Sequence, residues 1–188
     1  MKRWFFNKAL RILLITNGLI LIAGAMLGPI FAIFAEQVGG NILEAGIAGG
    51  LFALAAGVTT LISGKYADKM RRDEKIIIWG YVLMGAGFVL YIFVNSVWFL
   101  FAVQIVVGIG EAIYSPAFDA LYSRHITVKK AGREWGLWES MNYFTAAGGA
   151  ALGGFIASRF GFHPLFVIMA ALCFGSAIYL LQLKKNVL

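Results

Sequence analysis

The chain has 188 residues, of which 61% are hydrophobic and only 13% are charged, and its formal net charge is +7. A soluble domain usually carries about 45–50% apolar and about 25% charged residues, so this chain has too few polar side chains to cover a water-exposed surface. The composition therefore excludes an ordinary soluble protein and predicts an integral membrane protein. The single cysteine, Cys173, excludes a disulfide within the chain.

Six apolar stretches, separated by charged or turn-rich segments, follow one another along the chain. They cover residues 10–35, 43–64, 76–94, 98–122, 136–158 and 164–182. Each is about long enough to cross a bilayer as a helix, which takes about 20 residues. The first has no small-residue cleavage site before a polar region, so we expect a retained span rather than a signal peptide. The sequence predicts an all-α membrane protein with one six-span bundle over residues 1–188.

Lysine and arginine lie almost entirely on one side of the predicted bundle. Of the 16 such residues, all but Arg159 precede the first stretch or lie at its start, follow the last, or lie between stretches two and three or four and five. Positive charge marks the cytoplasmic side of membrane proteins, so we expect a cell-membrane protein with both termini in the cytoplasm. The same placement explains the net charge without a nucleic-acid partner.

Two segments of the chain resemble each other. Ala25, Pro29 and Phe31 recur as Ala112, Pro116 and Phe118 at an offset of 87, and residues 62–66 echo 156–160. An odd number of spans separates the two units, so the second would be inverted in the membrane. The pattern predicts a three-plus-three inverted repeat, a known construction of secondary transporters.

The fourth stretch carries an unusual set of polar and small residues on one face. Within an arc of about 80° of a helix lie Gln104, Gly108, Glu111, Ser115, Asp119 and Tyr122. Glu111 falls about halfway along the stretch, where a charged side chain costs at least ~2.5 kcal/mol on insertion scales.

Two hypotheses account for Glu111. In the first, it belongs to the wall of a substrate or proton pathway together with Asn17, Gln104, Ser115 and Asn142. In the second, it makes a structural hydrogen bond to Asn17, Asn142 or Tyr143. Intramembrane ionisable groups are functional by default, which favours the pathway.

Glycines gather on single faces of two predicted helices. Gly46, Gly50, Gly57 and Gly64 follow near-helical spacing, and Gly149 and Gly153 are four residues apart. Small residues let helices approach closely in lipid, so both faces predict tight helix packing.

Enzyme signatures are missing from the sequence. It contains no nucleophile elbow, no His-Glu-x-x-His and no phosphate-binding loop, and His125 and His163 fall in loops on opposite sides. We therefore expect no enzymatic activity, no metal and no cofactor, while coupling to protons through Glu111 remains compatible with the sequence.

Several motifs resemble those of the major facilitator superfamily. The segment from Gly64 to Arg72 is similar to the family's loop motif between spans two and three, with Ala67, Asp68 and Lys69 also matching. Residues 100–110 look like its fourth-span motif, with Gln104 where arginine is typical. Residues 149–154 resemble its fifth-span antiporter motif, with Ala150 in place of proline, and residues 136–140 resemble the start of that span in drug-exporter-like members.

The resemblance covers only the N-terminal six-helix half of a family member. It implies half of a major facilitator fold and a cytoplasmic gate of Asp68, Lys69 and Arg72 beside Gly64. Asp119 is a plausible partner of that gate, and with Glu139 we expect it to join a cytoplasmic charge network with loop arginines.

A half-size chain allows several functions. We expect a transporter of a small solute that works by alternating access, as a parallel homodimer or with a second six-span half. The alternatives are a non-transporting membrane scaffold or partner subunit, and the N-terminal fragment of a twelve-span transporter. Substrate, coupling ion and direction stay open.

Overall fold

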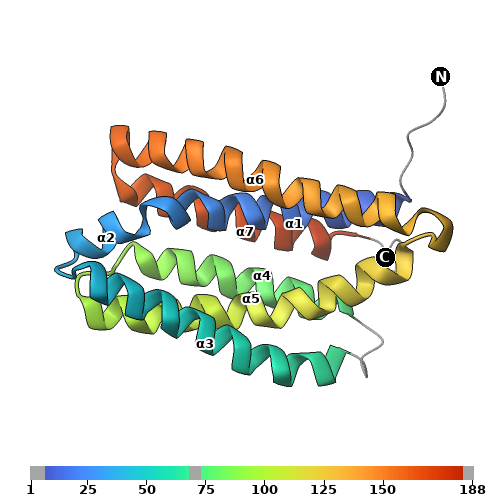
Figure 1. The fold of residues 1–188 in the computed structure, drawn as a ribbon, viewed down its shortest axis with the longest axis horizontal. Helices are drawn as coiled ribbons and strands as arrows, with labels where there is room; N and C mark the ends of the chain where they lie inside the picture. Colours follow the sequence, from blue (N-terminus) through green and yellow to red (C-terminus); the bar gives the residue numbers. More distant parts are fainter. Residues whose placement is uncertain (1–6, 68–72, 184–188) are drawn as a thin grey trace.

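A computed structural model describes residues 7–67 and 73–183, and within these ranges the chain is helical with no strand. The helices lie roughly side by side along one direction (Figure 1). Their bounds are α1 Lys8–Leu27, η1 Gly28–Ile30, α2 Phe31–Gln37, α3 Ile42–Ala67, α4 Asp73–Tyr91, α5 Val97–His125, η2 Val128–Lys130, α6 Ala131–Phe160 and α7 Phe162–Leu181.

Local sequence signals explain where the helices begin and end. Asn41 and Glu44 cap α3 reciprocally: Oδ1 of Asn41 accepts from the N–H of Leu43 at 2.7 Å, and Oε2 of Glu44 accepts from the N–H of Asn41 at 2.9 Å. Gly39 and Gly161 adopt φ values of +88° and +82°, which only glycine takes up readily. They end α2 and α6 and allow the chain to reverse direction.

The first predicted span, 10–35, is not one continuous α-helix. The 3₁₀ turn at Gly28–Ile30 separates α1 from α2. Pro29 lies inside this turn and has no N–H to donate to the preceding helical turn, which interrupts the α-helix. By length and apolarity, residues Lys8–Gln37 together still form one candidate span.

Five described segments are long and apolar enough to cross a membrane, namely Lys8–Gln37, Ile42–Lys65, Glu74–Tyr91, Val97–His125 and Phe162–Leu181. They correspond to five of the six predicted spans. The remaining one, 136–158, falls within α6, which has 30 residues but is not among the five. Its sequence is rich in glycine and alanine and carries several polar side chains, so it is less apolar than its neighbours.

The helices form two groups of three that contact each other mainly through α4 and α7. α1 packs on α6 and α7, whereas α5 packs on α3 and α4, and α4 packs on α7. α1 and α5 run in opposite directions along the bundle (Figure 1). These main contacts are symmetric. If α1 is exchanged with α5, α3 with α6 and α4 with α7, the same set of helix pairs is obtained.

The core lies where α1, α4, α5 and α7 meet. Its largest fully buried side chains include Tyr81, Phe118, Tyr122 and Phe166. Ser176 of α7 donates a 3.1 Å hydrogen bond to the carbonyl of Thr16 in α1. Buried hydroxyls are thus satisfied by backbone carbonyls within the bundle.

The predicted glycine packing is confirmed for α6 and wrong for α3 within this chain. A Cβ on Gly149 would lie 2.7 Å from Ala25 Cβ, and one on Gly153 would collide with the backbone of Met26, so α6 rests closely on α1. By contrast, a Cβ on Gly46, Gly50, Gly57 or Gly64 would meet no described atom within 4 Å. The close approach of α3 to α5 instead uses Gly108, where a Cβ would lie 2.5 Å from the carbonyl oxygen of Phe52.

Candidate functional site

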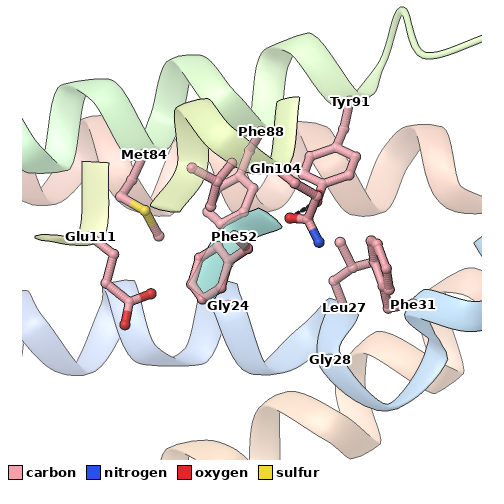
Figure 2. Close-up of a pocket in the computed structure, with 11 residues that line it drawn as sticks. Gly24, Leu27, Gly28, Phe31, Phe52, Met84, Phe88, Tyr91, Gln104 and Glu111 are labelled. Atoms are coloured by element: carbon pink, nitrogen blue, oxygen red, sulfur yellow. Dashed lines mark hydrogen bonds between the residues drawn. The ribbon is translucent and has the colours of Figure 1, made fainter. Parts of the chain in front are cut away.

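Two cavities lie between α1 and α5, and Glu111 lines both of them. Glu111 is the fifteenth of the 29 residues of α5 and therefore lies at the middle of that helix. Its side chain points from α5 towards α1 (Figure 2). A carboxylate is thus placed between two cavities at the depth that the sequence predicts.

The larger cavity has a volume of about 330 Å³ and walls that are mostly apolar and aromatic. It is lined by Gly24, Leu27, Gly28, Phe31, Phe52, Met84, Phe88, Tyr91, Gln104, Val107 and Glu111. Glu111 and Gln104 both extend from α5, with Phe52 and Phe88 between them (Figure 2). Apolar walls with a few placed polar groups are typical of small-molecule sites, which usually measure about 300–1,000 Å³.

Gln104 is oriented by a tyrosine from α4. The hydroxyl of Tyr91 donates a hydrogen bond of 2.8 Å to Oε1 of Gln104, and both side chains are buried. The Tyr91 ring is itself held by stacking on Phe166 at 5.0 Å and by an edge contact with Phe34 at 5.7 Å. Gln104 therefore has a fixed amide orientation at one end of the larger cavity.

The smaller cavity has a volume of about 190 Å³ and a more polar lining. It is lined by Asn17, Leu21, Glu111, Tyr114, Ser115, Phe118, Asp119, Trp138 and Asn142. Tyr81 donates to Oδ1 of Asn17 at 3.2 Å, and Nδ2 of Asn142 donates to the carbonyl of Trp138 at 3.2 Å. All five predicted pathway residues thus line one of the two cavities or both.

Glu111 itself is partly buried and makes no hydrogen bond or ion pair with any described residue. The hypothesis of a structural hydrogen bond names Asn17, Asn142 and Tyr143 as its partners. The two amides engage other groups, as stated above, and the Tyr143 side chain is 73% exposed. The arrangement leaves the carboxylate available to a ligand or a proton.

The α5 helix continues through a proline close to Glu111, and a neighbouring helix supplies the missing hydrogen-bond donor. Pro116 cannot donate the N–H that would normally bond to the carbonyl of Ala112. The hydroxyl of Ser63 in α3 donates to that carbonyl at 2.7 Å. The carbonyl adjacent to Glu111 is therefore satisfied by a side chain from another helix.

The predicted cytoplasmic gate is only partly within the described chain. Gly64 lies near the end of α3, while Asp68, Lys69 and Arg72 lie outside the described residues. Asp119 and Glu139 are both exposed, and the Asp119 backbone carbonyl accepts a 2.7 Å bond from Ser123. The charge network expected of Asp119 and Glu139 stays a prediction.

Sequence reasoning missed the tyrosines that hold the site and the aromatic walls. Tyr81 and Tyr91 orient Asn17 and Gln104, and Phe31, Phe52 and Phe88 line the larger cavity. A buried tyrosine usually needs a partner for its hydroxyl, and that expectation could have singled out both. Their partners could not be found, because they lie on other helices.

Metal chemistry has no support in the described residues. No group of three or more histidine, cysteine, aspartate or glutamate side chains in residues 7–67 and 73–183 could hold a metal ion.

Known proteins match nearly the whole chain. The profile that describes the Major Facilitator Superfamily matches residues 13–186. Similar proteins include Multidrug resistance protein MdtG of Proteus mirabilis, 29% identical over 92% of this chain and 44% of that protein. The proteins of the same name from Salmonella schwarzengrund and Enterobacter lignolyticus are each 26% identical over 89% of this chain and over 42% and 41% of their own lengths.

The chain therefore spans less than half the length of these relatives. The family profile covers most of the chain, and five described segments are long and apolar enough to cross a membrane. The chain is a multi-pass membrane protein that belongs to the Major Facilitator Superfamily, a family of transporters of small molecules that act without enzymatic chemistry or a cofactor.

Proposed function

We propose that this chain is half of a secondary transporter that moves a small solute across the cell membrane by alternating access. The observation that carries the proposal is Glu111, which lies at the middle of α5, borders two cavities and has no bonding partner among the described residues. A carboxylate at that depth costs at least ~2.5 kcal/mol on insertion scales, and such residues mark transport pathways.

Glu111 would bind a cationic group of the solute or carry a proton. Asn17, Ser115 and Asn142 would line the pathway on one side of it and Gln104 on the other, in keeping with the two cavities. The aromatic walls suit an amphipathic solute, because rings provide both apolar contact and attraction for a cation. The multidrug resistance named in the matched relatives favours a drug-like solute of this kind.

The topology that we propose has six spans in a three-plus-three inverted repeat, with α6 as the fifth span. The exchange symmetry of the helix contacts supports it, as does the close packing of α6 on α1 through Gly149 and Gly153. Both termini would be cytoplasmic. In support, the described lysines and arginines other than Arg159 all belong to one end of the bundle (Figure 1).

A second wall of the site would come from another chain. We propose a parallel homodimer or a pairing with a second six-span half, because transporters of this kind bind their substrate at the interface between two halves. The glycine face of α3 at Gly46, Gly50 and Gly57 has no partner among the described residues, so it is available for close helix contact. The gate of Gly64, Asp68, Lys69 and Arg72 would close the cytoplasmic side, with Asp119 and Glu139 nearby.

The function is tested by efflux of a fluorescent lipophilic cation, ethidium, from cells that lack their main exporters and produce this chain. We expect Glu111→Gln to reduce the efflux rate by about tenfold or more, because it removes a charge that is made available to the solute or proton. Glu36→Gln, which changes an exposed glutamate in α2, is the matched control and should leave efflux unchanged.

Efflux that is equal for wild type and Glu111→Gln at equal protein levels would contradict the proposal and favour a non-transporting scaffold.

The partner is tested separately by cross-linking in membranes. Gly50 or Gly57 is replaced by cysteine, one at a time, in a Cys173→Ser background. A product of twice the chain mass indicates a homodimer, and a product of another mass indicates a second half. Only monomers would reject both assemblies.

A further inference from the structure

We propose that Tyr91 and Gln104 form a specificity site that selects solutes with an oxygen acceptor on the order of 10 Å from their cationic group. The inference rests on the proposed function, because it assumes that the larger cavity binds the solute. Glu111 requires a cationic group on the solute, and the Tyr91–Gln104 pair adds a second requirement, an oxygen acceptor.

The amide N–H donors of Gln104 have no partner among the described residues, whereas its oxygen already accepts one hydrogen bond. Its Oε1 is occupied by the hydroxyl of Tyr91 at 2.8 Å, and Gln104 makes no other hydrogen bond to the described residues. The side chain of Gln104 is only 7% exposed, yet it lines the cavity. The amide nitrogen lies towards Leu27, which also lines the cavity (Figure 2).

Buried donors without a partner are costly, so a ligand that accepts from them gains a favourable contact. Tyr91 keeps the donors in place because its ring is fixed by Phe34 and Phe166. The Tyr91 side chain is 3% exposed, so water does not compete readily for its hydroxyl. The two N–H donors of the Gln104 amide are therefore held in position before any solute binds.

The spacing of the two polar groups sets the length of the solute. Gln104 and Glu111 are seven residues apart on α5, so they share one face and lie about 10 Å apart along the helix axis. Between them the lining is apolar, with Phe52, Phe88 and Val107. A solute that matches Glu111, the apolar lining and Gln104 has a cationic amine, an apolar body and a carbonyl or ether oxygen at its far end.

Two matched probes test this requirement. 3-(4-Acetylphenyl)propylamine carries a carbonyl oxygen about 10 Å from its amine, and 3-(4-ethylphenyl)propylamine lacks that oxygen at nearly the same size. Binding of each to the 188-residue chain in lipid nanodiscs is measured by isothermal titration calorimetry. We expect the acetyl probe to bind about two- to tenfold more tightly, as for one neutral hydrogen bond.

The variants separate specificity from general binding. Gln104→Leu should remove the preference, so that the two longer probes bind this variant with similar affinities. Tyr91→Phe keeps the ring and should reduce the preference, because the freed amide can turn its oxygen to the cavity. Glu111→Gln should weaken both probes by similar factors and leave their ratio unchanged. The shorter pair, 4-acetylbenzylamine and 4-ethylbenzylamine, should show no preference, since it cannot span both groups.

The outcomes distinguish this inference from the proposed function. Equal binding of the two longer probes, or a preference that survives Gln104→Leu, would overturn the specificity site and leave the transport proposal standing. A preference of the same size in the shorter pair would overturn the spacing argument. If neither longer probe binds to the wild-type chain, the larger cavity is not a solute site and both proposals lose their basis.

Discussion

The hydroxyl of Ser63 in α3 donates a 2.7 Å hydrogen bond to the carbonyl of Ala112 in α5, the carbonyl that Pro116 leaves without its helical donor. The bond joins two helices beside Glu111. A proline in the helix interior removes one backbone hydrogen bond, and here a side chain from the neighbouring helix replaces it. The position of Ser63 is thus explained by a residue 53 positions further along the chain.

Removing that hydroxyl should destabilise the bundle only while the proline is present. We expect Ser63→Ala to lower the free energy of unfolding by about 0.5–1.5 kcal/mol, because the carbonyl of Ala112 loses its donor. In a Pro116→Ala background, the restored N–H can bond to Ala112, so Ser63→Ala should have little effect. Reversible unfolding in mixed micelles measures this cycle, and equal effects in both backgrounds would contradict the explanation.

The contact of α6 with α1 should tolerate no side chain at Gly153. A Cβ there would collide with the backbone of Met26, whereas one on the adjacent Gly154 would meet nothing within 4 Å. We expect Gly153→Ala to cost about 1–3 kcal/mol of stability through overpacking, and Gly154→Ala to be nearly neutral. Thermal unfolding of the two variants in detergent is the measurement. Similar melting temperatures for the pair would show that α6 does not pack on α1 in this way.

Glu111 should reduce the stability of the folded chain while serving transport. Because the carboxylate is partly buried without a described partner, Glu111→Gln should raise the free energy of unfolding, by up to about 2.5 kcal/mol. Stability and efflux would then change in opposite directions, as is common at functional sites. A Glu111→Gln variant that is less stable than wild type would instead indicate a structural bond to the carboxylate.

The proposed orientation makes opposite loops accessible from opposite sides. With the buried Cys173 replaced by serine, we expect Asn95→Cys to react with an impermeant maleimide added to intact cells. Lys129→Cys should react only after the cells are opened, because η2 lies at the end of the bundle that carries most of the positive charge. Both residues are exposed in the structure. The reverse labelling pattern would mean that the termini lie outside.

Much of the site could be predicted from its own helix. The spacing along residues 98–122 places Gln104, Glu111 and Ser115 on one face, and these residues line the two cavities of the structure. This works because a helix fixes the angular position of every side chain through its 3.6-residue period. Glu111 was identifiable by its charge in an apolar stretch, whatever surrounds it.

The sequence by itself determined the membrane character of the chain, the apolar stretches that become helices and the one-sided placement of positive charge. Only the tertiary structure decided that Tyr91 orients Gln104, that Ser63 supplies the donor that Pro116 lacks, and that Gly108 rather than the glycine face of α3 is used in packing. The physical reason is that lipid tails are as apolar as leucine, so an apolar helix face does not select its neighbour. Close packing and a few interhelical hydrogen bonds make that choice, and they join residues far apart in the sequence.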